Sequence, residues 1–228
     1  MAELRVREVF DWLSGRGPSP PAWTVQNSTQ VAPEASWHRI GGGNAKEVFR
    51  ATLRGGEPVI LKRLRADWSW NPMGTHESAR ELLYLSFLHG RVGVPLLLGA
   101  YVTRPWPAHG QLVWAVQDIR GFGIGRGSGH VDSPAVMSEE YRQLAASQPV
   151  DLALAILDCF RSFSEVGGFF LQDFTPRQFV TAVSKHNEHT VLFELVDGPA
   201  PCAPRISHSL AATQLRHRTL LVALATDL

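Results

Sequence analysis

The chain has little of several features that would assign it to a specialised class of protein. Its 228 residues include only two cysteines, Cys159 and Cys202, too few for a disulfide framework. No apolar run approaches the roughly 18 residues that a membrane span needs, so we expect no transmembrane helix. The N-terminus carries acidic residues and lacks the apolar core of a secretory signal peptide. We therefore expect a soluble chain.

An excess of one charge sign is also missing. The chain has 22 Lys and Arg against 21 Asp and Glu, which gives a formal net charge of +1. Proteins that bind nucleic acid usually carry a basic patch or stripe, so we expect no nucleic-acid partner. In contrast, 44% of the residues are hydrophobic, enough for the core of one domain or of a small two-lobed domain.

Composition divides the chain into four regions. Residues 1–36 predict a leader helix and a linker, because the prolines near residue 20 interrupt any helix. Residues 37–120 contain the extended runs of a five-stranded sheet. Residues 121–150 begin with alternating glycines and predict a flexible connector. Residues 151–228 predict a helix, a hairpin and a C-terminal remainder, so the fold class is α+β.

Hydrophobic patterns give the expected elements within these regions. The run at 78–88 has the spacing of a helix, with Glu77 and Glu81 on its polar side, and the run at 151–166 has that of a core-facing helix in which Cys159 is a packing residue. The expected strands of the N-terminal sheet and of the later hairpin are 48–53, 58–62, 94–102, 111–119, 179–183 and 191–196.

A glycine-rich segment and a lysine lie on neighbouring predicted strands. Gly41 and Gly43 precede Val48, and glycines at this spacing allow a hairpin to close over phosphate groups without side-chain clashes. Lys62 ends a run of β-branched residues, so we expect its ammonium to face a cleft, where it can bind phosphate and a helix carboxylate. A solvent-exposed edge lysine is the simpler alternative.

Glu81 is the carboxylate that we choose for Lys62. Glu77 lies one turn earlier on the same helix face and stays open, because the exact register of a predicted helix is uncertain by a few residues.

Two aspartates and a glutamine supply the remaining chemistry. Asp173 lies five residues before Gln178, the interval that kinases use between the catalytic base and a metal-binding amide. Asp197 follows an apolar strand and precedes a glycine, the position of a metal-binding carboxylate. The alternatives are that Asp173 caps a turn, that Gln178 lies on the surface and that Asp197 is a turn residue before Gly198-Pro199.

The order of these parts resembles a divergent protein kinase. In particular, the chain resembles the vertebrate lonesome kinase family of secretory-pathway tyrosine kinases. The features that carry this resemblance are Lys46 at the place of the third glycine, the string from Asp173 to Val180, and Cys202 after Asp197. The resemblance covers residues 37–202 and implies a two-lobed kinase fold with an incomplete C-terminal lobe. It also implies that ATP is used with Mg²⁺ or Mn²⁺, and that the partner is a protein substrate in the secretory pathway or outside the cell.

The resemblance implies a role for each candidate residue. Gly41, Gly43, Val48 and Lys62 would bind ATP, with Glu81 holding Lys62. Asp173 would be the catalytic base, and Gln178 and Asp197 would bind the metal ion.

Two sequence details bear on the substrate and on regulation. Thr175 replaces the lysine that is usual in Ser/Thr kinases, and Arg177 stands where tyrosine kinases often have arginine, so we expect tyrosine as the acceptor. The residue directly before Asp173 is not an arginine, so we expect no switch by phosphorylation of an activation loop. Because 26 residues follow Cys202, we expect a truncated C-terminal lobe.

Two other functions stay open at this point. The missing third glycine, the missing Phe after Asp197 and the short C-terminus favour a pseudokinase or an interaction fragment. A kinase that phosphorylates a small molecule is the other possibility.

Overall fold

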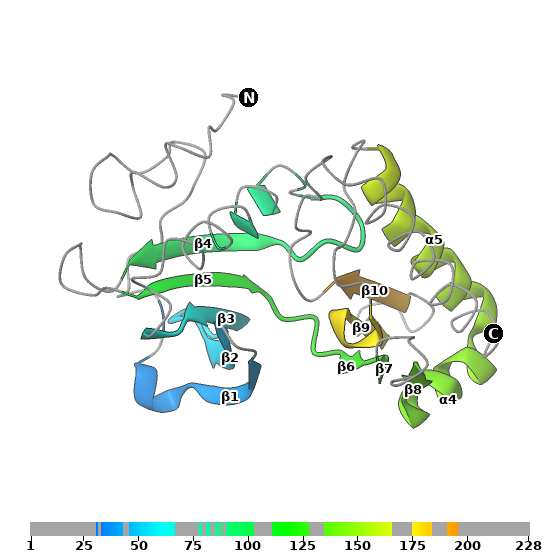
Figure 1. Ribbon diagram of the computed structural model, residues 1–228, viewed down its shortest axis with the longest axis horizontal. Coiled ribbons are helices and arrows are strands. Elements are labelled where there is room, and N and C mark those ends of the chain that lie inside the picture. Colours follow the sequence, from blue (N-terminus) through cyan, green and yellow to red (C-terminus); the bar gives the residue numbers. More distant parts are fainter. Residues whose placement is uncertain are drawn as a thin grey trace. The chain divides into compact units, whose positions relative to one another are not determined.

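The computed structural model has mixed α and β structure, with small antiparallel sheets and α-helices, which confirms the α+β class (Figure 1). The chain divides into two compact units. The first consists of Met1–His89 and Leu96–Asp118, and the second of Gly90–Pro95 and Ile119–Leu228. None of the helices described is both long enough and apolar enough to cross a bilayer. The leader helix predicted near the N-terminus lies outside the described residues. These are residues 31, 33–42, 46–66, 78, 81–82, 85–86, 88, 90–102, 111–127, 135–165, 175–183 and 191–195.

The first unit contains the five-stranded antiparallel sheet that the sequence predicts, with the strand order β1-β2-β3-β5-β4. A short 3-10 helix, η2 (Glu34–Ser36), precedes it. The strands are β1 (His38–Gly42), β2 (Lys46–Thr52), β3 (Pro58–Leu64), β4 (Leu97–Val102) and β5 (Leu112–Gln117). Between β3 and β4, the described residues 78, 81–82 and 85–86 are helical, and we refer to these positions as the Glu81 helix.

Side chains of successive strand residues alternate between the two faces of this sheet. Strand β3 carries buried side chains on both faces, since Leu61 is fully buried and its neighbour Lys62 is 1% exposed. This double burial explains the continuous apolar run before Lys62. One face carries an apolar cluster formed by Val31, Phe49, Ala51, Val59, Leu61, Tyr101, Val113 and Ala115.

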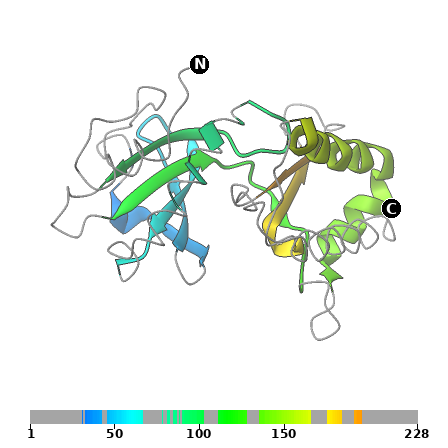
Figure 2. The same cartoon turned by 45° about the horizontal axis from the view of Figure 1, so that its top comes forward.

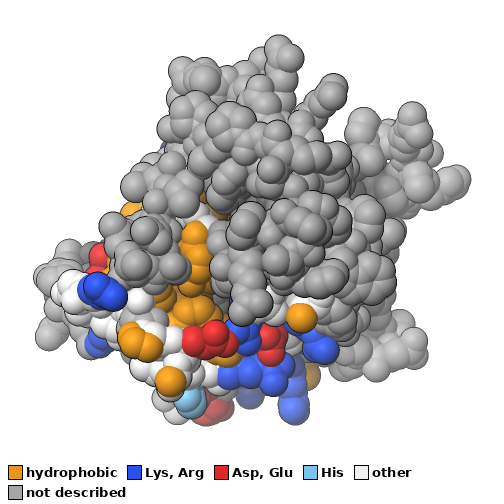
Figure 3. Space-filling model, turned by 90° about the vertical axis from the view of Figure 1, so that its left-hand side faces the viewer, with side chains coloured by type: hydrophobic (Ala, Val, Ile, Leu, Met, Phe, Trp, Pro, Cys, Tyr) orange, Lys and Arg blue, Asp and Glu red, His pale blue; other side chains and the backbone are white. Residues whose placement is uncertain are grey.

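Arg63 of β3 ties the segment before β1 to the face that carries the apolar cluster. Its guanidinium donates to the carboxylates of Glu34 in η2 and of Glu47, in the latter case at 3.2 and 3.0 Å. It lies over the rings of Trp37 and Phe49, 5.8 and 4.8 Å from their centroids. Burial alone would lower the pKa of Arg63, but its hydrogen bonds to Glu34 and Glu47 outweigh that effect and raise it. In Figure 3, basic and acidic side chains lie next to one another on one face of the molecule.

Tyr101 of β4 belongs to the same apolar cluster. Burial raises the pKa of its hydroxyl to about 12, with a smaller contribution from the carboxylate of Glu34, while the charge of Arg63 lowers it. The hydroxyl is therefore neutral at physiological pH, as a group within an apolar cluster should be.

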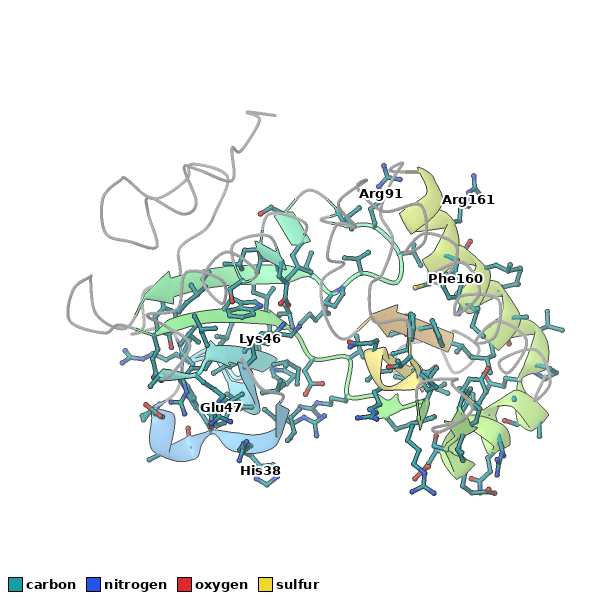
Figure 4. The ribbon with its side chains drawn as sticks, viewed as in Figure 1. His38, Lys46, Glu47, Arg91, Phe160 and Arg161 are labelled. Atoms are coloured by element: carbon teal, nitrogen blue, oxygen red, sulfur yellow. The ribbon has the colours of Figure 1, made fainter. Side chains whose placement is uncertain are left out.

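The second unit combines α4 (Glu139–Ser147) and α5 (Pro149–Glu165) with short strands and the 3-10 helix η3 (Pro176–Gln178). Helix α5 lies beside β10 (Figure 2). Phe160 of α5 lies 6.0 Å from the ring of Phe179, whereas Arg161 points away from the sheet (Figure 4). The predicted helix at 151–166 and the predicted hairpin at 179–196 are confirmed. The strands are β6 (Phe122–Gly123), β7 (Gly125–Arg126), β8 (Val136–Met137), β9 (Phe179–Val183) and β10 (Val191–Leu195).

Much of the expected flexible connector at 121–150 is regular structure, which corrects that expectation. Strands β6, β7 and β8 and helix α4 all lie within it. Ser138 caps α4, since its hydroxyl accepts from the backbone N–H of Tyr141 at 3.2 Å. A Cβ on Gly125 would lie 2.4 Å from the carbonyl oxygen of Val136. This glycine therefore permits close pairing of β7 with β8 and is not a sign of a linker.

We expect Gly42→Ala to lower the free energy of unfolding of the first unit by about 1–3 kcal/mol, the usual cost of a strained backbone residue. Gly42 has a φ of +145°, and an added Cβ would lie 2.7 Å from the carbonyl oxygen of Lys46. Gly41→Ala is the matched control, because its Cβ would meet nothing within 4 Å. Urea unfolding monitored by tryptophan fluorescence measures both, and equal losses would contradict the assignment.

Candidate functional site

Lys62 lies at the centre of the sheet in the first unit. Its backbone pairs with Val48 of β2 on one side and with Trp114 of β5 on the other. The side chain is 1% exposed, and its Nζ donates to Oε1 of Glu81 at 2.8 Å. The pairing with Glu81 that we predicted is thus present, and the alternative of a solvent-exposed edge lysine is excluded.

Glu81 is buried, although the sequence placed it on the polar side of its helix. It is 5% exposed and lies among the fully buried residues Leu82 and Leu85 of the same helix. A buried carboxylate is stable when ammonium groups compensate its charge, and two lysines do so here. The helix side that we predicted as polar thus carries a buried carboxylate that binds two lysines. The alternative partner, Glu77, lies outside the described residues.

Lys46 is the second lysine, and its contact with Glu81 was not predicted. Its Nζ donates to Oε2 of Glu81 at 2.5 Å, so each carboxylate oxygen accepts from a different ammonium group. The same Nζ lies 5.8 Å from the centroid of the Trp114 ring. The side chain of Lys46 is 25% exposed, whereas that of Lys62 is 1% exposed. Lys46 and Glu47 are successive residues of β2, so their side chains lie on opposite faces of the sheet (Figure 4).

The glycine segment adjoins this cluster through β1 and β2. Gly41 pairs with Val48, and Gly42 pairs with Glu47, before β1 ends and β2 begins at Lys46. The hairpin that we predicted around Val48 is present on its two described strands. Gly43 lies outside the described residues. Gly42 combines positive φ with a close backbone contact, whereas a Cβ on Gly41 would meet nothing within 4 Å.

Trp114 and Asp118 belong to the first unit, but sequence reasoning missed both. Trp114 is fully buried on β5, and its Nε1 has no hydrogen-bond partner among the described residues. Asp118, directly after β5, accepts from Nε of Arg50 at 2.7 Å. An aspartate at the end of a predicted strand was the signal available in the sequence, but a sequence pattern does not reveal its partner 68 residues away.

The candidates in the second unit are described in part. Gln178 ends η3 and is partly buried, and its backbone N–H donates to the carbonyl oxygen of Thr175 at 3.0 Å. Thr175 is buried, and Arg177 is exposed. Asp173 and Asp197 lie outside the described residues, so their roles as base and metal ligand stay predictions.

The donor set bears on the expected metal ion. An amide oxygen such as that of Gln178 suits Mg²⁺, which prefers oxygen ligands. Within the part of the chain that is described, His, Cys, Asp and Glu nowhere gather in a group of three or more suited to a metal. Gln178 and Asp197 stay the predicted ligands of the metal ion.

The buried cluster has a definite chemical capacity. A lysine fixed by a carboxylate presents its ammonium group at a defined place, which suits binding of a phosphate group. Comparison with known proteins does not assign the chain to a family: no protein-family model matches it, and no curated protein is significantly similar to it.

Proposed function

We propose that the chain is a kinase-like domain that binds ATP with Mg²⁺ or Mn²⁺ and transfers the γ-phosphate to protein hydroxyl groups, with tyrosine as the acceptor. The observation that carries the proposal is the buried ion pair between Lys62 and Glu81, 2.8 Å long. Protein kinases require this pair, formed by a lysine on strand β3 and a glutamate on the following helix.

Three features of the first unit support the nucleotide-binding part. Lys62 lies on the third of the described strands and Glu81 on the helix described next, the order that kinases use. The glycine hairpin of β1 and β2 is hydrogen-bonded directly to the strand that carries Lys62. Val48 is the register partner of Lys62, so an apolar side chain lies beside the ammonium-bearing residue.

The transfer step is assigned to residues of the second unit through the sequence pattern. Asp173 would accept the proton of the acceptor hydroxyl while the oxygen attacks the γ-phosphorus and ADP leaves. Gln178 and Asp197 would hold the metal ion, which neutralises charge on the phosphates. The kinase-like fold of the whole chain, with two lobes, belongs to the same proposal.

A pseudokinase, which binds nucleotide without transfer, is the second candidate. The contact between Lys46 and Glu81 favours it, because Lys46 occupies one oxygen of the carboxylate that holds Lys62. Sequence features at Asp197 point the same way, since a glycine follows it directly. The two candidates share the nucleotide site and differ in whether phosphate is transferred.

We expect saturating MgATP to raise the melting temperature of the wild-type chain and to have little effect on Lys62→Met. A ligand that binds only the folded state stabilises it by about 2.7 kcal/mol at 100 times its Kd. Differential scanning fluorimetry over a range of MgATP concentrations measures the shift. No shift in the wild type, or an equal shift in Lys62→Met, would overturn the assignment of the nucleotide site.

A further inference from the structure

Lys46 has a position that the proposed function does not use. It is the first residue of β2, directly after the glycine segment, and it pairs in register with Leu64 of β3. Lys62 pairs with Val48, two residues further along β2. Residues two apart on a strand lie on the same face, so Lys46 and the register partner of Lys62 share one side of the sheet.

Both lysines contact the same carboxylate from this side. The Nζ atoms of Lys46 and Lys62 lie 2.5 and 2.8 Å from the two oxygens of Glu81. Because one carboxylate joins them, both ammonium groups lie within reach of a single polyphosphate chain. A triphosphate presents several strong acceptor oxygens to such a pair.

Exposure distinguishes the two lysines. Lys62 is 1% exposed and is fixed, whereas the side chain of Lys46 is 25% exposed and reaches solvent at the glycine hairpin. An incoming anion can therefore approach Lys46 without opening the sheet. The ring of Trp114, 5.8 Å from its Nζ, favours a cation at this place.

We propose that Lys46 is a second phosphate-binding residue, whose ammonium group contacts the polyphosphate of ATP beside that of Lys62. This inference rests on the proposed nucleotide site and extends it by one residue. In the structure, Lys46 donates to Glu81. With ATP present, the phosphates offer greater negative charge than a carboxylate shared by two ammonium groups, and Lys46 turns to them. The lysine thereby replaces, with a side chain, contacts that a third glycine would leave to the backbone.

The test compares binding of MgATP and of adenosine, which lacks phosphate, by isothermal titration calorimetry. We expect Lys46→Met to raise the Kd for MgATP about 10- to 100-fold, the typical effect of losing a hydrogen bond to a charged group. The Kd for adenosine should change by less than about threefold, within the context dependence of such contacts. Lys46→Arg keeps the cation and should retain most of the affinity for MgATP.

Arg63→Met is the matched control. It also removes a cation that is bonded to carboxylates, but Arg63 lies on the opposite face of the sheet, with Phe49 and Trp37. We expect lower stability and an unchanged Kd for MgATP. Melting temperatures without ligand identify any variant that fails to fold. If Lys46→Met does not fold, Lys46→Gln, which keeps a polar side chain without the charge, takes its place with the same expected loss of MgATP affinity.

The outcomes separate the two proposals. Unchanged MgATP affinity in Lys46→Met, or an equal loss of affinity for adenosine, would show that Lys46 only forms an ion pair with Glu81. Either result would overturn the phosphate-binding role of Lys46 alone. Absence of any MgATP binding by the wild type would overturn the proposed function, and this role with it.

Discussion

Changing Glu81 to glutamine is expected to lower the free energy of unfolding of the first unit by about 3 kcal/mol, the lower end of the range for a broken buried ion pair. The reason is the position of Lys62, which is 1% exposed and donates to Glu81 at 2.8 Å. Glutamine keeps the shape of the side chain but not its charge, so the ammonium loses its anionic partner in a place that water does not reach. Urea unfolding, followed by tryptophan fluorescence, measures the loss.

Two further variants test this explanation. Glu34→Gln also removes a carboxylate that accepts from a partly buried cation, Arg63, but Glu34 is 65% exposed, so we expect a loss of less than about 1 kcal/mol. The double variant Lys62→Met with Glu81→Leu should recover much of the stability, because an apolar pair can replace a buried ion pair. A loss equal to that of Glu34→Gln, or a double variant as unstable as the sum of its parts, would contradict the account.

Changing Asp173 to asparagine is expected to lower kcat for phosphate transfer by about 10²- to 10⁴-fold, the usual worth of general-base assistance. The Kd for MgATP should remain within about threefold of the wild type, because the base acts on the acceptor hydroxyl and the predicted contacts to the nucleotide are made by Lys62 and the metal ligands. Transfer of radiolabelled γ-phosphate to a pool of tyrosine-containing peptides measures kcat.

The control for this variant is Asp158→Asn, which removes an aspartate from the exposed side of α5. It should transfer phosphate at the wild-type rate. Equal rates for Asp173→Asn and the wild type would remove Asp173 from the mechanism. A wild type that binds MgATP and transfers nothing would favour the pseudokinase.

The sheet and the pair within it could be predicted because their signals are local. Alternation and β-branched residues marked β2 and β3 to within two residues of their ends, and Lys62 stood out as a charged residue at the end of an apolar run. The helical spacing of residues 78–88 then made Glu81 a candidate for the carboxylate that pairs with Lys62. The structure makes the choice, because the carboxylate lies 2.8 Å from Nζ of Lys62.

The parts that the sequence missed depend on contacts between distant residues. Lys46 and Glu81 are 35 positions apart, and a lysine beside glycines has the composition of a solvent-exposed turn. The burial of Glu81 follows from its two lysine partners and not from the pattern of its own helix. In the same way, Val136 on the neighbouring strand approaches the backbone of Gly125 closely. The glycine-rich composition of this segment, taken alone, predicted flexibility.

The most direct test of the nucleotide site is covalent labelling by an ATP analogue that carries an acyl group on its terminal phosphate. A lysine amine beside the phosphates attacks the acyl carbon, and the nucleotide leaves with its phosphate, so mass spectrometry of the digested chain identifies the acylated residue. We predict acylation of Lys62, with or without Lys46, which excess MgATP prevents. Labelling that spares Lys62, or that excess MgATP does not reduce, would contradict the account.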